Sequence, residues 1–352
     1  MENLSYVPFS SINLDDSFFS TLKSDYSEFT AWFDKKARVG EHAYVLRTDT
    51  GAIEGFMYLK PELGEVLDID PALPNGKHLK VGTFKFDSHG TRRGERFIKK
   101  VFDHAMSEEV DDVYVTVFDK HEYLLHLFAL YGFEKVSVKT TQNGQESVLV
   151  KNMTSYKGDI LKDYPRMNSE GVNKYLLSIQ PEYHTRMLPD SILNNESHDL
   201  IKDISHSNSI HKIYICAMND TALFKSGDLL AIYRTNDYKG PARFRSVITS
   251  IGVVEQYKSI FEFSSLQDFK DYCSSYSVFS DQELTDIFNN KKYIHIIKFT
   301  YNTAMQKRTI RDKLIKEVGL KEKDYWGVMK LTDNQFKHII SLGDINESFI
   351  IN

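Results

Sequence analysis

The sequence has few cysteines and no long apolar run, and both absences narrow the class of protein. Cys216 and Cys273 form no CxxC motif and need not be bonded to each other, which favours a reducing compartment. No stretch approaches the roughly 18 consecutive apolar residues of a membrane-spanning helix. The first residues have neither the basic segment nor the apolar core of a signal peptide. We therefore expect a cytoplasmic protein with no membrane partner.

The chain also lacks an excess of positive charge. Its formal net charge of -5 argues against a protein that coats nucleic acid through its global charge, although a local basic patch is still allowed. Three histidines between residues 198 and 211 have neither HExxH spacing nor paired cysteines beside them, so we expect no metal site. No internal repeat or low-complexity tract is visible.

What the chain does contain is the composition of an ordinary globular protein. Its 352 residues, 41% hydrophobic and 26% charged, are too many for one typical core and predict two domains. The segment 153–171 interrupts the pattern with Gly, Pro, Ser and Asn. We predict a first domain over 1–155, a linker over 156–171 and a second domain over 172–345. The sequence leaves a homodimer open.

The first half alternates strand and helix patterns. Hydrophobic periodicity and turn residues predict, in order, a hairpin over 41–62, a strand over 78–87, a helix over 94–109, a strand over 111–119, a helix over 120–133 and a hairpin over 134–152.

The stretch "SHGTRRGERFIKK" (88–100) lies where the strand 78–87 gives way to a helix. Free N–H groups at a helix start favour anions, and glycines let a ligand approach the backbone. Arg92 and Arg93 add positive charge. This pattern is that of an anion site, although the loop taken alone favours the alternative, a tight strand-to-helix turn with solvated arginines. It is not the dinucleotide fingerprint, because "GTRRG" lacks the third glycine.

The order of elements, together with this loop and the later Gly132-Phe133, resembles the GNAT superfamily of acyl-CoA N-acyltransferases over roughly residues 20–152. The resemblance implies a mixed α/β sheet flanked by helices, acetyl-CoA as cosubstrate and direct attack by an acceptor amine. Backbone groups around Phe84 and Phe86 would bond the pantetheine arm and polarise the thioester. His89 stands where the family commonly has a basic or amide residue. The implied pyrophosphate cradle consists of His89, Gly90, Thr91, Arg92, Arg93, Gly94 and Glu95.

The catalytic residues are less clearly marked. Where the family often has a tyrosine as general acid, four residues before the glycine of Gly-Phe, this chain has Phe128. Tyr131 is a candidate acid nearby, as are Tyr123 and His126, but a helix points each in a different direction from Phe128. Glu54 and His121 are candidate bases, with a surface or packing role as the alternative for each.

The second half resembles the PUA-like group of small β-barrels, the ASCH and EVE relatives, over roughly 172–342. The resemblance rests on "SGDLLAIYR", "SIGVVEQY", "KIYICAM" and "YWGVMKLTDNQFKHI", in which Gly227 and Asp228 serve a turn and Gly252 a bend. It implies a small β-barrel with helices that binds RNA, tRNA or a modified nucleotide. Candidate contacts are Tyr233 and Arg234, with Arg243 and Arg245 across a loop, since aromatic and arginine side chains stack on and hold bases. A core tyrosine and solvated arginines are the alternative.

A local basic segment supports the same idea. Residues 291–330 hold eleven Lys and Arg against four Asp and Glu. A helix over 307–316 would place Lys307, Arg311 and Lys313 near one side, where a phosphate backbone could bind. A solvated helix face is the alternative interpretation.

These patterns predict an acetyl-CoA-dependent N-acetyltransferase whose second domain presents RNA or a nucleotide-containing substrate. Two other hypotheses remain open at this point. The first domain could have lost turnover, leaving a regulatory protein that binds nucleic acid or a modified base. Alternatively, the enzyme could acetylate a protein or a small amine while the second domain serves only as an interaction module.

Overall fold

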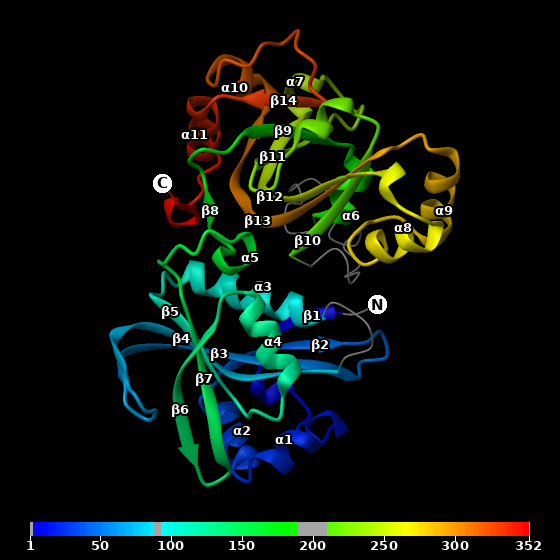
Figure 1. The fold of residues 1–352 in the computed structure, drawn as a ribbon. Coiled ribbons are helices and arrows are strands. Elements are labelled where there is room, and N and C mark those ends of the chain that lie inside the picture. Colours follow the sequence, from blue (N-terminus) through cyan, green and yellow to red (C-terminus); the bar gives the residue numbers. More distant parts are fainter. Residues whose placement is uncertain (1–2, 88–92, 189–209, 352) are drawn as a thin grey trace. The chain divides into compact units, whose positions relative to one another are not determined.

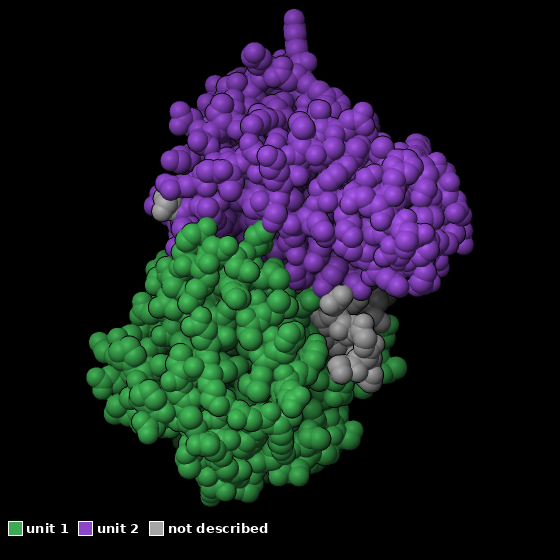
Figure 2. Space-filling view, in the orientation of Figure 1, with its two compact units in different colours: residues 1–163, 202–204 green, residues 164–201, 205–352 purple. Residues whose placement is uncertain are grey.

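The structure is a computed structural model that describes residues 3–87, 93–188 and 210–351. It divides into two compact units, with the division in the chain between Asp163 and Tyr164, and Figure 2 shows them in different colours. This division falls inside the segment 156–171 that the sequence analysis assigns to a linker.

Unit 1 is built on one seven-stranded mixed sheet with the order β1-β2-β3-β4-β5-β7-β6 (Figure 1). Its pairs are antiparallel except for β4 and β5, which are parallel. The elements are β1 (Asn3–Pro8), α1 (Ser20–Asp25), α2 (Phe29–Arg38), β2 (His42–Arg47), β3 (Ile53–Val66), β4 (Leu73–Phe86), α3 (Arg93–Ser107), β5 (Asp112–Val117), α4 (Glu122–Leu130), β6 (Glu134–Thr141), β7 (Gly144–Asn152) and α5 (Ile160–Asp163).

Helices cover both faces of this sheet, because alternate residues of each strand point to opposite faces. On one face, Phe29 and Phe33 of α2 pack in a buried aromatic cluster with Phe56 of β3. On the other face, the Phe97 ring of α3 lies directly over Gly55, where a Cβ would come within 2.6 Å of it. Unit 1 is therefore a three-layer α/β structure.

The predicted elements of unit 1 are confirmed, with some ends extended and others shortened. Both hairpins form, and the helices predicted over 94–109 and 120–133 are α3 and α4. Sequence analysis did not foresee β1, α1 or α2. The central strand β4 begins at Leu73, ahead of the predicted start, because its first residues pair with the end of β3 despite Pro74 and Gly76.

Unit 2 is built on a six-stranded sheet with the order β10-β13-β12-β11-β9-β14, plus the short parallel pair β8–β15. The elements are β8 (Met167–Asn168), β9 (Lys174–Ile179), α6 (Pro181–Met187), β10 (His211–Cys216), β11 (Leu229–Arg234), α7 (Ala242–Arg245), β12 (Val247–Ser259), α8 (Leu266–Cys273), α9 (Asp281–Asn290), β13 (His295–Ile310), α10 (Arg311–Lys316), β14 (Val328–Leu331), α11 (Asp333–Leu342) and β15 (Ile350–Ile351).

The prediction of a small barrel is not confirmed. Among the residues that the structure describes, the six strands form an open sheet with β10 and β14 at its edges. The long strands β12 and β13 do shift register at three places, and such bulges bend and twist a sheet. Unit 2 is therefore a mixed α/β unit around a bent, open sheet.

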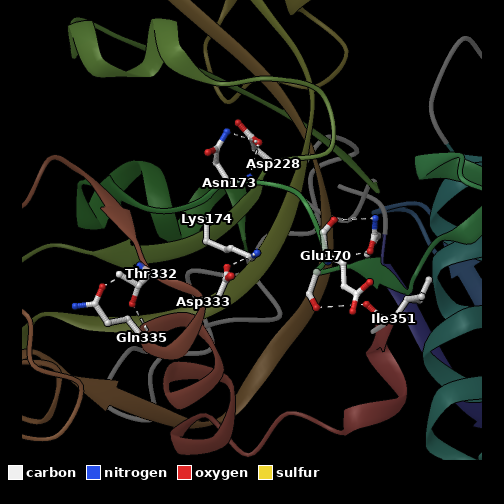
Figure 3. A network of polar contacts seen from close by, with 10 residues as sticks. Glu170, Asn173, Lys174, Asp228, Thr332, Asp333, Gln335 and Ile351 are labelled. Atoms are coloured by element: carbon white, nitrogen blue, oxygen red, sulfur yellow. Dashed lines mark hydrogen bonds and ion pairs between the residues drawn. The ribbon is translucent and has the colours of Figure 1, made fainter.

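The turn predicted at Gly227-Asp228 is structural, as the sequence indicated. Gly227 has a φ of +91°, and the buried Asp228 accepts hydrogen bonds from the backbone N–H and side-chain amide of Asn173 at 3.0 and 3.1 Å. The next residue, Lys174, forms an ion pair with Asp333 at 2.6 Å (Figure 3). These contacts tie the start of β9 to β11 and α11.

The helix predicted over 307–316 is shorter than expected. Thr309 and Ile310 still belong to β13, paired with Ile248 and Val247 of β12, so α10 begins only at Arg311. β-branched residues suit a strand, and here the pairing with β12 overrides the helical spacing. Lys307 therefore lies on a strand and shares no helical face with Arg311.

Candidate active site

Unit 1 contains a large cavity beside its central strands. Its volume is about 990 Å³, which is large enough for a sizeable ligand. Its walls come from α1 and α2, strands β3 to β5, the start of α4 and the β6–β7 hairpin.

The cavity opens where two parallel strands separate. β4 and β5 pair only from His78–Asp112 to Val81–Val115, although β4 continues to Phe86 and β5 to Val117. Backbone groups of β4 beyond Val81 that point toward β5 therefore have no partner in that strand. Such groups are hydrogen-bond donors and acceptors available to a ligand.

A bulge in β4 lies at this same point. Tyr58 of β3 pairs with Thr83 and Leu59 pairs with Val81, so Gly82 is the extra residue. A Cβ on Gly82 would lie 2.8 Å from the Tyr58 ring. Bulges redirect the backbone at functional sites, and this one lies on the cavity wall.

The predicted coenzyme A loop is described only at its two ends. Phe84 and Phe86 of β4 line the cavity. His89, Gly90, Thr91 and Arg92 lie outside the described residues.

On the helical side of the loop, Arg93 begins α3, and Gly94 and Glu95 are buried in its first turn. A Cβ on Gly94 would meet the Phe86 ring at 2.9 Å and Leu127 at 2.8 Å. Gly94 therefore lets α3 begin tightly against β4 and α4.

Of the three predicted catalytic residues, only His121 lines the cavity. Its Nε2 lies 3.6 Å from the Asp25 carboxylate, and it precedes the first residue of α4. Glu54 lies on β3 away from the lining, and Tyr131 is fully buried, with its ring 6.3 Å from that of Phe102. The structure thus does not bring the three together.

Phe128 occupies the expected place on α4 and is also fully buried. Its ring centroid lies 5.1 Å from that of Phe84 on β4. Tyr123, one turn earlier on the helix, lines the cavity and is 60% exposed. The hydroxyl nearest in sequence that reaches the cavity therefore belongs to Tyr123.

Sequence analysis missed several charged residues that line the cavity. Glu62 of β3 accepts a hydrogen bond from Tyr114 and lies 2.6 Å from Lys60. Burial would raise the pKa of Glu62, but the bonds from Lys60 and Tyr114 outweigh it, and the pKa is lowered. Glu146 of β7 accepts a hydrogen bond of 2.8 Å from Tyr26. These partners are 52 and 120 residues apart in sequence, so no local pattern could have revealed them.

A buried histidine outside the cavity lining joins β4 and β5 at the first pair of their ladder. His78 Nδ1 lies 2.8 Å from the Asp112 carboxylate, and Nε2 lies 2.9 Å from the Gly64 carbonyl. Burial opposes charging of His78, yet Asp112 outweighs it and the pKa of His78 is raised. This contact links β4 to β5 at the first residue pair of their ladder.

In unit 2, most of the cations predicted to bind nucleic acid are already paired. Arg243 lies against Asp312, Arg245 against Asp237, and Lys307 lies 3.0 Å from Asp344. A phosphate would have to compete with these carboxylates.

Two of the remaining predicted residues of unit 2, Tyr233 and Arg311, lie against the ring of Trp326. Tyr233 is buried, with its ring centroid 5.3 Å from that of Trp326. The Arg311 guanidinium lies 4.3 Å from the Trp326 ring, and Arg234 is buried. Burial lowers the pKa of the neighbouring His184 to about 3, and the positive charge of Arg234 adds to the effect. This interior is polar and cationic.

Neither metal coordination nor a membrane span has support in the described part of the chain. Its His, Cys, Asp and Glu side chains form no group of three that could hold a metal ion, although the segment 198–211 with its three histidines lies almost wholly outside it. None of its helices is both long and apolar enough to cross a membrane.

The chain matches no protein-family model, and no curated protein is similar to it. Structural neighbours of both predicted kinds are found. The ASCH protein of Zymomonas mobilis shares 12% identity at a TM-score of 0.32, covering 48% of this chain and 94% of its own.

Two further solved structures are similar to this chain. The IAA acetyltransferase of Bacillus cereus shares 12% identity at a TM-score of 0.32, covering 43% of this chain and 98% of its own. A chain of the NatC complex, solved with Gag peptide and CoA, shares 14% identity at a TM-score of 0.29, covering 43% and 99%.

Proposed function

We propose that unit 1 is an N-acyltransferase that uses acetyl-CoA. The observation that carries this proposal is the separation of β4 from β5 after Val81 and Val115, directly on the wall of the 990 Å³ cavity. A thioester placed in that opening would meet unpaired backbone groups of β4, and an amine could approach it through the cavity.

The backbone of β4 would supply the main catalytic stabilisation. N–H groups between Gly82 and Phe86 that face the opening can donate to the thioester carbonyl as negative charge develops on its oxygen. Because they belong to a strand fixed by β3, they need little rearrangement when the reaction occurs. When bound, acetyl-CoA supplies the activated acyl group.

Proton transfer would fall to side chains that line the cavity. We assign His121 as the acceptor of the ammonium proton, because an imidazole is a common general base and Asp25 lies beside it to stabilise the protonated ring. Tyr123 is the hydroxyl available to the departing thiolate. A thiolate leaves readily, so such an acid would help without being essential.

Ligand-dependent unfolding tests the proposal. We expect acetyl-CoA at 100 times its Kd to stabilise the protein by about 2.7 kcal/mol. Leu124→Trp, on the cavity wall of α4, should remove this shift. Leu125→Trp, its half-buried neighbour outside the lining, should keep it. Gly94 is unsuitable for this purpose, because even a Cβ there crowds Phe86. If millimolar acetyl-CoA produced no shift, the proposal would fail.

We further propose that unit 2 presents an RNA or nucleotide-containing substrate. The supporting observation is an aromatic loop surface made of Tyr238, Phe244 and Tyr325, all exposed. Helix α7, which carries Phe244, comes close to the loop that carries Tyr325, because Arg243 of α7 lies 3.9 Å from Glu322 of that loop. Exposed aromatic rings beside arginines suit the stacking of single-stranded bases.

RNA binding should be tested on these rings and not on the paired arginines. Changing Arg243 or Arg245 to Glu would break ion pairs as well as any phosphate contact. We expect Tyr325→Ala to weaken binding of single-stranded RNA several-fold, measured by fluorescence anisotropy at two salt concentrations. Phe261→Ala, an exposed ring elsewhere in unit 2, is the matched control. Equal affinity in all three proteins would remove RNA presentation from the proposal.

A further inference from the structure

The cavity of unit 1 contains a lysine that makes no ion pair with the described residues. No carboxylate of those residues lies within ion-pair distance of Lys80 on β4, and its ammonium lies 5.4 Å from the centre of the Tyr114 ring. Burial and the positive charge of Lys139 lower the pKa of Lys80, and the more distant carboxylates of Glu62 and Asp68 offset only part of this shift. A partly buried cation with no carboxylate in contact favours an anionic ligand.

Two other lysines of the cavity lining are neutralised by carboxylates. Lys60 lies 2.6 Å from Glu62, and Lys139 lies 2.6 Å from Asp68. Lys85, also on β4, has no ion pair but donates hydrogen bonds to the Phe18 carbonyl and the Thr21 hydroxyl. Lys80 is therefore the lysine of this lining whose ammonium has neither an ion pair nor a hydrogen bond among the described residues.

A buried carboxylate that has no cationic partner among the described residues lines the same cavity. Glu146 on β7 is only 3% exposed, and its one hydrogen-bond partner in the described part of the chain is the Tyr26 hydroxyl. A buried carboxylate with a single neutral donor is short of positive charge. An ammonium group would complete its contacts.

Lys80 and Glu146 face the cavity from the same side of the sheet, well separated. Lys80 pairs with Tyr114 on β5, and Glu146 follows directly beyond the pair Val117–Ser147 on the other side of β5. Strand rise and spacing put their Cα atoms about 16 Å apart. The two side chains span part of this distance. The gap left between the Lys80 ammonium and the Glu146 carboxylate is too long for a single α-amino acid and matches two or three extended residues at ~3.5 Å each.

Building on the proposed acyl transfer, we infer that the acceptor is a short peptide of two or three residues with free amino and carboxyl ends. Its ammonium contacts Glu146 and its carboxylate contacts Lys80. The ammonium gives its proton to His121, the free amine attacks the thioester carbonyl, and coenzyme A leaves as the thiolate. The product is an N-acetylated peptide with its carboxylate still held by Lys80.

Binding of glycine peptides to the full chain tests this inference without acetyl-CoA. We expect triglycine to bind at least ten-fold more tightly than triglycinamide, which lacks the carboxylate, and N-acetyltriglycine, which lacks the ammonium. Ligand-observed NMR titration suits the weak affinities expected of peptides without side chains.

Two variants separate the contacts. Lys80→Met should bind triglycine and triglycinamide equally, but should still bind triglycine more tightly than N-acetyltriglycine. Glu146→Gln should bind triglycine and N-acetyltriglycine equally, but should still bind triglycine more tightly than triglycinamide. Lys80→Arg should restore the preference over the amide.

Three results would overturn the inference. Equal binding of triglycine and its amide would show that the acid group is not read, as expected of an enzyme for protein N-termini. Loss of both preferences in both variants would show a general structural effect. Tighter binding of free glycine than of triglycine would contradict the spacing. Each of these can occur while acetyl-CoA still stabilises the protein, so the inference and the proposed function fail separately.

Discussion

At the scale of single residues, His121 is the one of three catalytic candidates predicted from the sequence that lines the cavity. Its neighbour Asp25 comes from the end of α1, nearly a hundred residues earlier, and also contacts Lys120 at 2.6 Å.

We therefore expect His121→Gln to lower kcat/KM for acetyl transfer by about 10²–10⁴-fold, the usual contribution of a general base. His126→Gln, on the exposed side of the same helix, is the matched control. An unchanged kcat/KM in His121→Gln would assign the proton to another group.

Gly132 shows how one backbone position supports the site. It has a φ of +84°, and a Cβ would lie 2.5 Å from the Lys162 carbonyl, which already accepts a bond from Lys151. Backbone cannot move aside as a side chain can. We expect Gly132→Ala to destabilise unit 1 by about 2–4 kcal/mol in chemical denaturation, from strain and crowding together.

Gly40→Ala separates the two causes. Gly40 has a similar φ of +76° but nothing within 4 Å of its Cβ position, so only strain remains and the expected cost is about 1 kcal/mol. Equal losses in the two variants would show that the Lys162 contact contributes nothing.

At the scale of elements, the parallel pair β4–β5 combines a fixed end with an open end. His78 and Asp112 join the strands at one end of the ladder, and no ladder exists beyond Val81 and Val115 at the other. The width of the opening therefore depends on how firmly the four-residue ladder holds.

The fixed end should make stability depend on pH. The pKa of His78 is higher in the folded protein than its ordinary value. The contribution of this ion pair to the free energy of unfolding is therefore complete at pH values below the pKa of His78 in the unfolded chain, and it disappears as the pH rises through the pKa in the folded protein. His78→Gln should cost about 1–3 kcal/mol at pH 6 and less at pH 9, measured by urea denaturation. Asp112→Asn should remove the same pH-dependent difference. A cost that did not vary between the two pH values would contradict this account.

Elements with strong periodicity could be predicted, and those defined by distant partners could not. The α3 pattern, with Phe97, Val101 and Phe102 at helical spacing, was sufficient to locate that helix. β13 runs through a stretch with helical spacing because β12 supplies hydrogen bonds to Thr309 and Ile310. The same holds for the candidate site. The order of strand, loop and helix predicted a ligand site beside β4, whereas the proposed roles of Lys80 and Glu146 depend on the register of β4, β5 and β7.

At the scale of the whole molecule, the two units have separate cores and separate sheets. All residues that line the large cavity belong to unit 1. We expect residues 1–163 expressed alone to fold and to bind acetyl-CoA within about three-fold of the full chain, measured by isothermal titration. Residues 164–352 alone should bind none. A soluble, folded first fragment without affinity would show that the site needs unit 2.

The uneven distribution of two residue types makes each unit separately observable. Both thiols, Cys216 and Cys273, are buried in unit 2, and burial raises the pKa of each. Unit 1 has no cysteine, but its one indole, that of Trp32, lies on the cavity wall. Thiol labelling of the wild-type chain therefore reports the opening of unit 2 alone, while quenching of the Trp32 emission, once Trp326 is replaced by Phe, reports what enters unit 1.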